Sequence, residues 1–209
     1  MSHDAGKADQ IALHFYTKLF NIIYDARATA ELPERSKTDK WFNLDIPDPD
    51  LFPRDVRDKY KTLSPSSLPP PFELQVLLCV PELVTNQVLV QLTPNSSRTR
   101  VDPSLRFILL ESWKFVHSPR TPSEDDSTDI ALPTIYKHAI TLFRSLYSLL
   151  RLLPSWNLYK RIRRRTGGHN RNGNLSIKLR VRTGSEDDSN IPVLGFGESI
   201  HTSDRHARL

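Results

Sequence analysis

A nearly continuous apolar segment between Pro133 and Pro154 constrains this chain more than any other feature of its sequence. Proline is tolerated in the first turn of a helix but ends a helix that reaches it later. A helix that is apolar on nearly every side is typical of a protein interior. We therefore expect a buried central helix over about 133–153. Its cations recur every seven residues and form one stripe that reaches water or a bound anion: Lys137, Arg144 and Arg151.

Alternating apolar and polar residues predict four strands, over 72–80, 86–92, 105–116 and 174–182. The first is apolar on both sides, so we expect it to be buried on both faces. Glu111 interrupts the apolar face of the third strand and is expected to lie near an edge or to find a partner. The apolar residues expected to share that face are Phe107, Leu109, Trp113 and Phe115.

The other segments indicate one domain over 9–183, preceded by a flexible N-terminus over 1–8 and containing a first helix over 11–28. A proline-rich strap over 46–71 cannot form a central strand or a long helix. An acidic loop over 117–130 holds candidate phosphorylation sites, although such short motifs also arise by chance. These elements predict an α+β fold in which a mostly antiparallel sheet is backed by helices.

The charge distribution favours an anionic partner. The net charge is +5, but no aspartate or glutamate occurs from 130 to 185. Such a region attracts phosphate, acidic peptide, nucleic acid or acidic lipid. On the last strand, Lys178, Arg180 and Arg182 share one face and repel each other unless solvent or an anion lies between them. The alternative is a solvated basic surface without a dedicated ligand.

The patterns that catalysis or metal binding require are missing. No nucleophile, base and orienting group form a recognisable set, and Gly167-Gly168 lacks the Lys-Ser/Thr of a phosphate-binding loop. The seven histidines are scattered, and the single cysteine, Cys79, rules out an internal disulfide or a cysteine-based zinc site. We expect no enzyme, no cofactor and no metal. We also expect no membrane span and no specific nucleic acid, because aromatic residues do not interleave with the basic ones.

The central apolar segment also carries a family resemblance. The run LPTIYKHAITLFRSLYSLLRLLPSW, from Leu132 to Trp156, resembles the N-terminal domain of the fungal autophagy-related protein thirteen family. Further similarities lie at 10–27, in KWFNL at 40–44, in LESW at 110–113 and in the strand at 174–182. The resemblance covers about residues 7–183, and the central run is its specific part.

The resemblance implies a HORMA fold, whose C-terminal region can move as a safety belt. Residues 184–209 are then expected to be a belt remnant or a flexible tail. The resemblance also implies a non-enzymatic regulatory subunit of the protein kinase complex that starts autophagosome formation. Family members usually continue into a long serine-rich region that binds the kinase. Because the sequence ends at Leu209, we expect a fragment or a short product.

The resemblance also implies partners and a location. The domain would recruit the phosphatidylinositol 3-kinase complex and the autophagy membrane protein carried by vesicles. In many species it pairs with a second, smaller HORMA protein. These partners imply a cytoplasmic protein at the phagophore assembly site.

Family members show a basic pocket proposed to sense phosphate. Arg151 resembles a family arginine, Lys160 resembles a basic position nine residues later, and Arg161 is a close substitute. Arg180 or Arg182 resembles a basic strand position. Many members have arginine where Ser112 stands, which departs from the pattern. Because guanidinium groups bind phosphate bidentately, the candidate phosphate and partner site consists of Arg151, Lys160, Arg161, Lys178, Arg180 and Arg182.

Two other functions remain open. The chain could be a basic module that binds anionic lipid or nucleic acid through residues 161–171, or a HORMA adaptor of another pathway. Salt separates a diffuse binder from a defined pocket, because diffuse binding weakens steeply with salt and depends little on any single residue.

Overall fold

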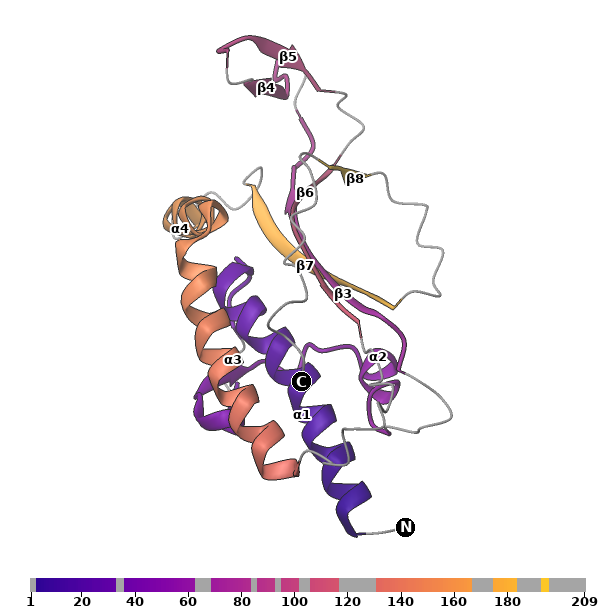
Figure 1. The fold of residues 1–209 in the computed structure, drawn as a ribbon. Coiled ribbons are helices and arrows are strands. Elements are labelled where there is room, and N and C mark those ends of the chain that lie inside the picture. Colours follow the sequence, from indigo (N-terminus) through magenta and orange to yellow (C-terminus); the bar gives the residue numbers. More distant parts are fainter. Residues whose placement is uncertain are drawn as a thin grey trace.

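A computed structural model describes residues 3–32, 36–62, 69–83, 86–92, 95–101, 106–116, 131–166, 175–183 and 193–195. Helices cover one face of a four-stranded sheet, and a small two-stranded ribbon projects from one end (Figure 1). In chain order the elements are α1 (His3–Arg27), β1 (Lys37–Asp39), the 3-10 helix η1 (Trp41–Asn43), β2 (Ile46–Asp48), α2 (Arg54–Asp58), β3 (Phe72–Cys79), β4 (Val90–Leu92), β5 (Arg98–Arg100), β6 (Phe107–Phe115), α3 (Leu132–Leu152), α4 (Pro154–Thr166), β7 (Ser176–Thr183) and β8 (Val193–Leu194).

The main sheet has the strand order β7–β3–β6–β8. β3 pairs antiparallel with both β7 and β6, while the short β8 runs parallel to β6. Phe72, Leu74 and Val76 of β3 have no exposed surface and lie in the core beneath the helices. The predicted strands over 72–80 and 174–182 are therefore confirmed as β3 and β7.

β6 confirms the third predicted strand but not its single apolar face. Val76 of β3 lies opposite Glu111, whereas the next residue, Leu77, lies opposite Leu109. The intervening Leu110 is therefore an extra residue, a β-bulge, and a bulge reverses the alternation of faces on its two sides. Trp113 and Phe115 pack toward the helices, so Phe107 and Leu109 lie on the opposite face.

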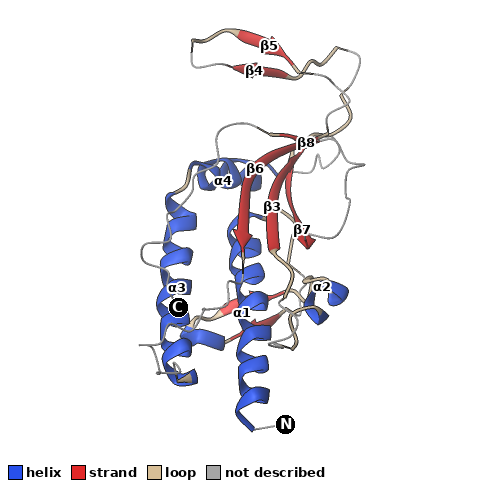
Figure 2. Cartoon of the chain, turned by 45° about the vertical axis from the view of Figure 1, so that its right-hand side comes forward, coloured by secondary structure: helices blue, strands red, loops and turns tan. Residues whose placement is uncertain are grey.

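The predicted strand over 86–92 is shorter than expected and does not join the main sheet. Its C-terminal part, β4, pairs antiparallel with β5 to form a separate ribbon. Figure 2 shows this ribbon standing away from the sheet and the helices. Apolar alternation indicates a strand, but it does not indicate which strand is its neighbour.

The central helix of the fold is α1. Its C-terminal half packs against both α3 and β7, and Leu19, Ile22 and Ile23 are completely buried. α1 begins at His3, so residues 3–8, which we assigned to a flexible N-terminus, are part of the helix.

The bounds of α3 agree with the predicted helix over 133–153, but its expected deep burial is wrong. Its buried stripe consists of Ala139, Phe143, Leu146 and Leu150. On other sides Leu142, Leu149 and Leu152 are 40%, 44% and 81% exposed. α3 therefore packs through one face, because α1 already fills the space next to the sheet.

The segment 37–48, which leads into the proline-rich strap, packs on α1 and is anchored by a buried lysine. Lys18 donates from Nζ to the carbonyl oxygens of Asp39 and Leu44, at 3.0 and 2.7 Å, and lies 3.1 Å from Asp39 Oδ1. Phe42 has a φ of 57° and stacks on Tyr136 of α3. Within the described part of 46–71, β2 and the five-residue α2 are the regular elements, as expected for a proline-rich segment.

Residues 154–166 form the helix α4. Pro154 occupies its first turn, and Tyr159 and Ile162 are buried against the core. Among the described helices, none combines the length and apolar character needed to cross a bilayer. The predicted acidic loop over 117–130 and most of the tail over 184–209 lie outside the described residues.

Buried tyrosines are expected to make the fold sensitive to alkaline pH. Burial, with a smaller contribution from Tyr16, raises the pKa of Tyr60 well above its ordinary value. This stabilisation is complete below about pH 10 and is lost as the pH rises toward the folded-state pKa. In urea denaturation from pH 9 upward, the free energy of unfolding should fall less for Tyr60→Phe than for the unmodified chain. If the free energy of unfolding fell equally with pH in the two proteins, buried Tyr60 would not be the cause of the alkaline sensitivity.

Candidate functional site

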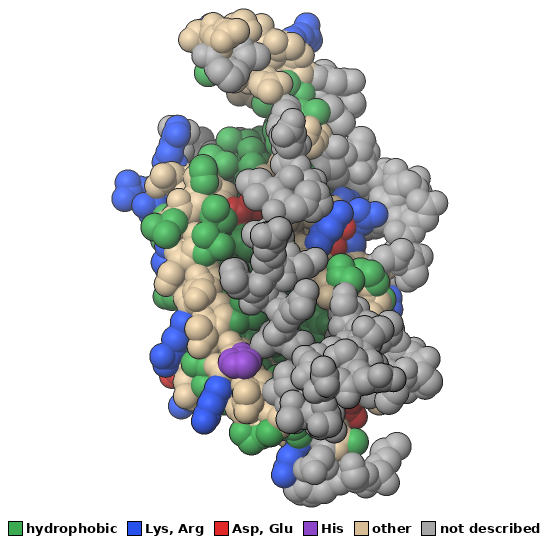
Figure 3. All heavy atoms as spheres, in the orientation of Figure 1, with side chains coloured by type: hydrophobic (Ala, Val, Ile, Leu, Met, Phe, Trp, Pro, Cys, Tyr) green, Lys and Arg blue, Asp and Glu red, His purple; other side chains and the backbone are tan. Residues whose placement is uncertain are grey.

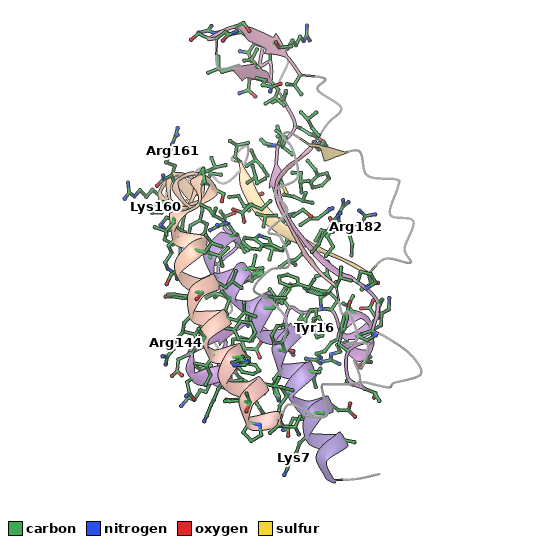
Figure 4. The ribbon with its side chains drawn as sticks, in the orientation of Figure 1. Lys7, Tyr16, Arg144, Lys160, Arg161 and Arg182 are labelled. Atoms are coloured by element: carbon green, nitrogen blue, oxygen red, sulfur yellow. The ribbon has the colours of Figure 1, made fainter. Side chains whose placement is uncertain are left out.

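The six predicted site residues fall into two groups in different parts of the fold. On β7, Ile177, Leu179 and Val181 pack toward the helices, so the alternating Lys178, Arg180 and Arg182 project from the opposite face of the sheet. Arg151, Lys160 and Arg161 lie at the junction of α3 and α4. Figure 4 shows Arg182 on one side of the molecule and Lys160 and Arg161 on the other. The structure does not bring Arg151, Arg180 and Lys178 into one pocket.

The first group forms what we call the basic sheet face: Lys114, Lys178, Arg180 and Arg182. The strand register places Glu73 of β3 between Arg182 of β7 and Lys114 of β6. One step along the strands, Gln75 lies between Arg180 and Ser112. Directly opposite residues in an antiparallel sheet are within reach of each other. Among the described residues this face therefore has four cations and one carboxylate, Glu73, which lies between Lys114 and Arg182.

Hydrogen bonds connect this face. Arg180 donates from Nε and Nη2 to Gln75 Oε1, at 3.0 and 2.6 Å. Gln75 Nε2 and Ser112 Oγ donate to Glu73 Oε1, at 2.7 and 2.8 Å. Arg182 Nη1 lies 3.8 Å from Glu73 Oε2. The network holds the two guanidinium groups in fixed positions without neutralising both of them.

The electrostatics of the face leave an excess of positive charge. Burial acts to raise the pKa of Glu73, but hydrogen bonds from Gln75 and Ser112 and the charges of Lys114 and Arg182 lower it below its ordinary value. Glu73 is therefore ionised and offsets one cation. Two buried nitrogens on this face, Arg180 Nη1 and Arg182 Nε, have no hydrogen-bond partner among the described residues. Buried donors normally have partners, so these two are available to an anionic ligand.

Arg151 has a different role from the one predicted. Its Nη1 donates to the carbonyl oxygen of Tyr147 at 2.8 Å, and its guanidinium lies 3.3 Å from the centre of the Tyr147 ring. Its Nη2 lies 3.6 Å from Asp25 Oδ2 of α1. Burial raises the pKa of Asp25 despite the opposing charges of Arg151 and Arg163. Arg151 thus joins α3 to α1 and makes its contacts within the fold.

Lys160 lies beside an aromatic pair on α4. Trp156 and Tyr159 are stacked with their ring centres 5.1 Å apart, and Lys160 Nζ is 5.6 Å from the Trp156 ring. These residues, with Arg163 and Arg164, line an open hollow of about 380 Å³. Arg161 is exposed. Figure 3 shows Lys and Arg side chains around the end of the molecule that carries α4.

Sequence reasoning missed Glu73, Gln75 and Lys114 of the basic sheet face. Their alternation along β3 and β6 was visible, but their neighbours depended on strand order and on the bulge at Leu110. Ser112, which departs from the family pattern, binds Glu73 instead of supplying a cation.

Glu111 does find the partner expected for it. It accepts hydrogen bonds from Arg27 Nε and Nη2 of α1, at 2.9–3.1 Å. Trp113 Nε1 and Ser155 Oγ of α4 also donate to it. The Arg27 side chain has no exposed surface. This buried cluster joins α1, β6 and α4 on the face of the sheet that the helices cover.

Among the described residues, no group of three or more histidine, cysteine or acidic side chains could hold a metal.

Comparison with known proteins finds relatives along almost the whole chain. A family model described as "Autophagy-related protein 13" matches residues 13–208. Proteins of that name from Penicillium rubens and Yarrowia lipolytica are each 30% identical to this chain, over 90% and 100% of its length. "Autophagy protein 13" of Schizosaccharomyces pombe is 33% identical over 76% of this chain. The matches span 21%, 31% and 21% of those three proteins.

A solved structure described as "Atg13 HORMA domain" has a similar fold. It superposes with a TM-score of 0.59 at 18% sequence identity, covering 95% of this chain and 76% of that one. The expected α+β HORMA fold is therefore confirmed.

Proposed function

Because the chain belongs to the autophagy-related protein 13 family, we propose that it acts as a non-enzymatic adaptor of the protein kinase complex that initiates autophagy. Its basic sheet face binds a phosphorylated or acidic segment of a partner. The partners inferred from the family are the phosphatidylinositol 3-kinase complex, the vesicle-borne autophagy membrane protein and a second small HORMA protein. The proposed place of action is the phagophore assembly site in the cytoplasm.

One observation is the main support for the basic sheet face as the binding site. Arg180 and Arg182 each present a buried nitrogen without a partner, beside a carboxylate that offsets only one of four cations. A phosphate oxygen accepts strong charge-assisted hydrogen bonds from such fixed guanidinium groups. Arg151 is a weaker candidate because its guanidinium already has an acidic partner, a carbonyl oxygen and an aromatic ring.

Neutralising this face should weaken binding without unfolding the chain. We expect Arg182→Gln and Arg180→Gln each to lower the affinity for an acidic phosphoserine peptide about tenfold to hundredfold, since a charge-assisted hydrogen bond contributes about 1.5–3 kcal/mol. Fluorescence anisotropy with the phosphorylated and unphosphorylated peptides measures the difference.

The matched control is Arg161→Gln, which removes the same charge from an exposed position on α4. This control should bind the phosphopeptide as the unmodified chain does. Equal affinities for all three variants, or equal affinities for the two peptides, would refute the basic sheet face as a phosphate site.

A further inference from the structure

The ribbon β4–β5 has one face that combines exposed aliphatic side chains with arginines. Val90 lies opposite Arg100, and Leu92 lies opposite Arg98. Directly opposite residues of an antiparallel pair project from the same face, so all four side chains share it. Val90 and Leu92 are 47% and 67% exposed. The opposite face carries the polar pair Gln91 and Thr99.

Among the residues that the structure describes, no negative charge compensates the arginines of this face. No aspartate or glutamate occurs between residues 86 and 101. Within the described part of the chain, neither Arg98 nor Arg100 takes part in a salt bridge. The two guanidinium groups are therefore open to an external anion.

The ribbon also lacks the support of the main sheet. It pairs with no other strand in the described part of the chain and projects beyond the sheet (Figure 1). Two-stranded ribbons are marginally stable in water when nothing packs against their apolar face. An external surface that covered Val90 and Leu92 would therefore stabilise the ribbon as well as bind it.

A second group of cations lies toward the same end of the molecule. Lys160 and Arg161 project outward from α4 (Figure 4). Leu152, at the preceding end of α3, is 81% exposed. Exposed aliphatic side chains among cations suit a surface that offers both anionic groups and hydrocarbon.

We infer that this end of the molecule docks on an anionic lipid bilayer, with the apolar face of the ribbon entering the interface. Val90 and Leu92 insert among the lipids, the stems of Arg98 and Arg100 lie along the apolar boundary, and their guanidinium groups bind lipid phosphates. Lys160 and Arg161 add long-range attraction to the negative surface. This surface is separate from the basic sheet face and does not depend on the function proposed for it.

Vesicle co-sedimentation with the full 209-residue chain tests the inference. The chain should bind phosphatidylserine-rich vesicles and should not bind vesicles of phosphatidylcholine alone. Arg98→Gln with Arg100→Gln should lower the partition coefficient about 25-fold, because each cation near an anionic membrane contributes about fivefold. Val90→Ser with Leu92→Ser should lower it about tenfold.

The matched control changes the polar face of the same ribbon, as Gln91→Ala with Thr99→Ala, and should bind like the unmodified chain. Arg180→Gln, which changes the basic sheet face, should leave vesicle binding unchanged. The vesicle experiment can therefore refute membrane docking without refuting phosphopeptide binding, and the reverse also holds. Absence of vesicle binding, or equal binding by the ribbon variants and the control, would overturn the inference.

The single cysteine permits a direct test of insertion. In a Cys79→Ser background, an environment-sensitive fluorophore attached through Leu92→Cys should shift to the blue with phosphatidylserine-rich vesicles. The same fluorophore attached through Thr99→Cys should shift less. Equal spectra at the two positions would exclude insertion of the apolar face and leave only attraction at a distance, which contradicts the proposed docking mode.

Discussion

Glu111→Leu should lower the free energy of unfolding by about 3–5 kcal/mol, because it leaves the charge of Arg27 buried without a partner. Arg27 has no exposed surface, and Glu111 is the carboxylate that it contacts, at 2.9–3.1 Å. The free energy of unfolding of a domain is usually about 5–15 kcal/mol, so this single change would remove a large share of the chain's stability. Urea denaturation monitored by circular dichroism measures the change.

Two further variants separate the buried charge from the loss of packing. The double change Arg27→Met with Glu111→Leu removes both charges and should recover most of the stability, since a buried ion pair is often replaceable by apolar residues of similar size. Arg57→Met, which removes one partner of an exposed pair with Asp50, should cost less than about 1 kcal/mol. A double variant as unstable as Glu111→Leu would contradict the electrostatic explanation.

The same cluster shows which parts of the fold could be predicted from the sequence. Glu111 was recognised as a polar residue on an apolar strand that needs a partner, because burial of an unpaired charge is costly. The identity of that partner could not be predicted, since Arg27 lies at the end of a helix far away in the chain. Strands β3 and β7 and helix α3 were located correctly because their periodicity is local.

Burial was harder to predict than secondary structure. α3 has more apolar side chains than its contacts require, whereas α1 buries Lys18, Asn21 and Arg27 completely. Hydrophobic pattern alone therefore assigned the central position to the wrong helix. Lys18 and Arg27 are buried beside acidic and carbonyl partners from distant segments, and such partners leave no local signal in the sequence.

For the candidate site too, the features set by local alternation could be predicted and the features set by tertiary packing could not. The alternation in β7 correctly placed Lys178, Arg180 and Arg182 on one face. The position of Arg151 relative to them depended on how α3 packs, and the contributions of Glu73, Gln75 and Lys114 depended on strand order. The bulge at Leu110 leaves no signal in the alternation of β6, because the residues from 107 to 110 are all apolar.

The second large effect is expected at Lys18, which anchors Asp39 and Leu44 of the segment that leads into the strap. Lys18→Met should lower the free energy of unfolding by about 3–5 kcal/mol, because Asp39 keeps a buried negative charge after its cation is removed. The side chains of Lys18 and Asp39 are 0% and 5% exposed. Two carbonyl oxygens, of Asp39 and Leu44, lose a donor in the same variant.

A second substitution at the partner and a matched exposed lysine identify the cause. Adding Asp39→Asn should restore much of the stability at neutral pH. Lys61→Met, which breaks an exposed pair with Asp58, should leave the denaturation midpoint nearly unchanged. A double variant no more stable than Lys18→Met would instead assign the loss to packing and to the two carbonyl hydrogen bonds.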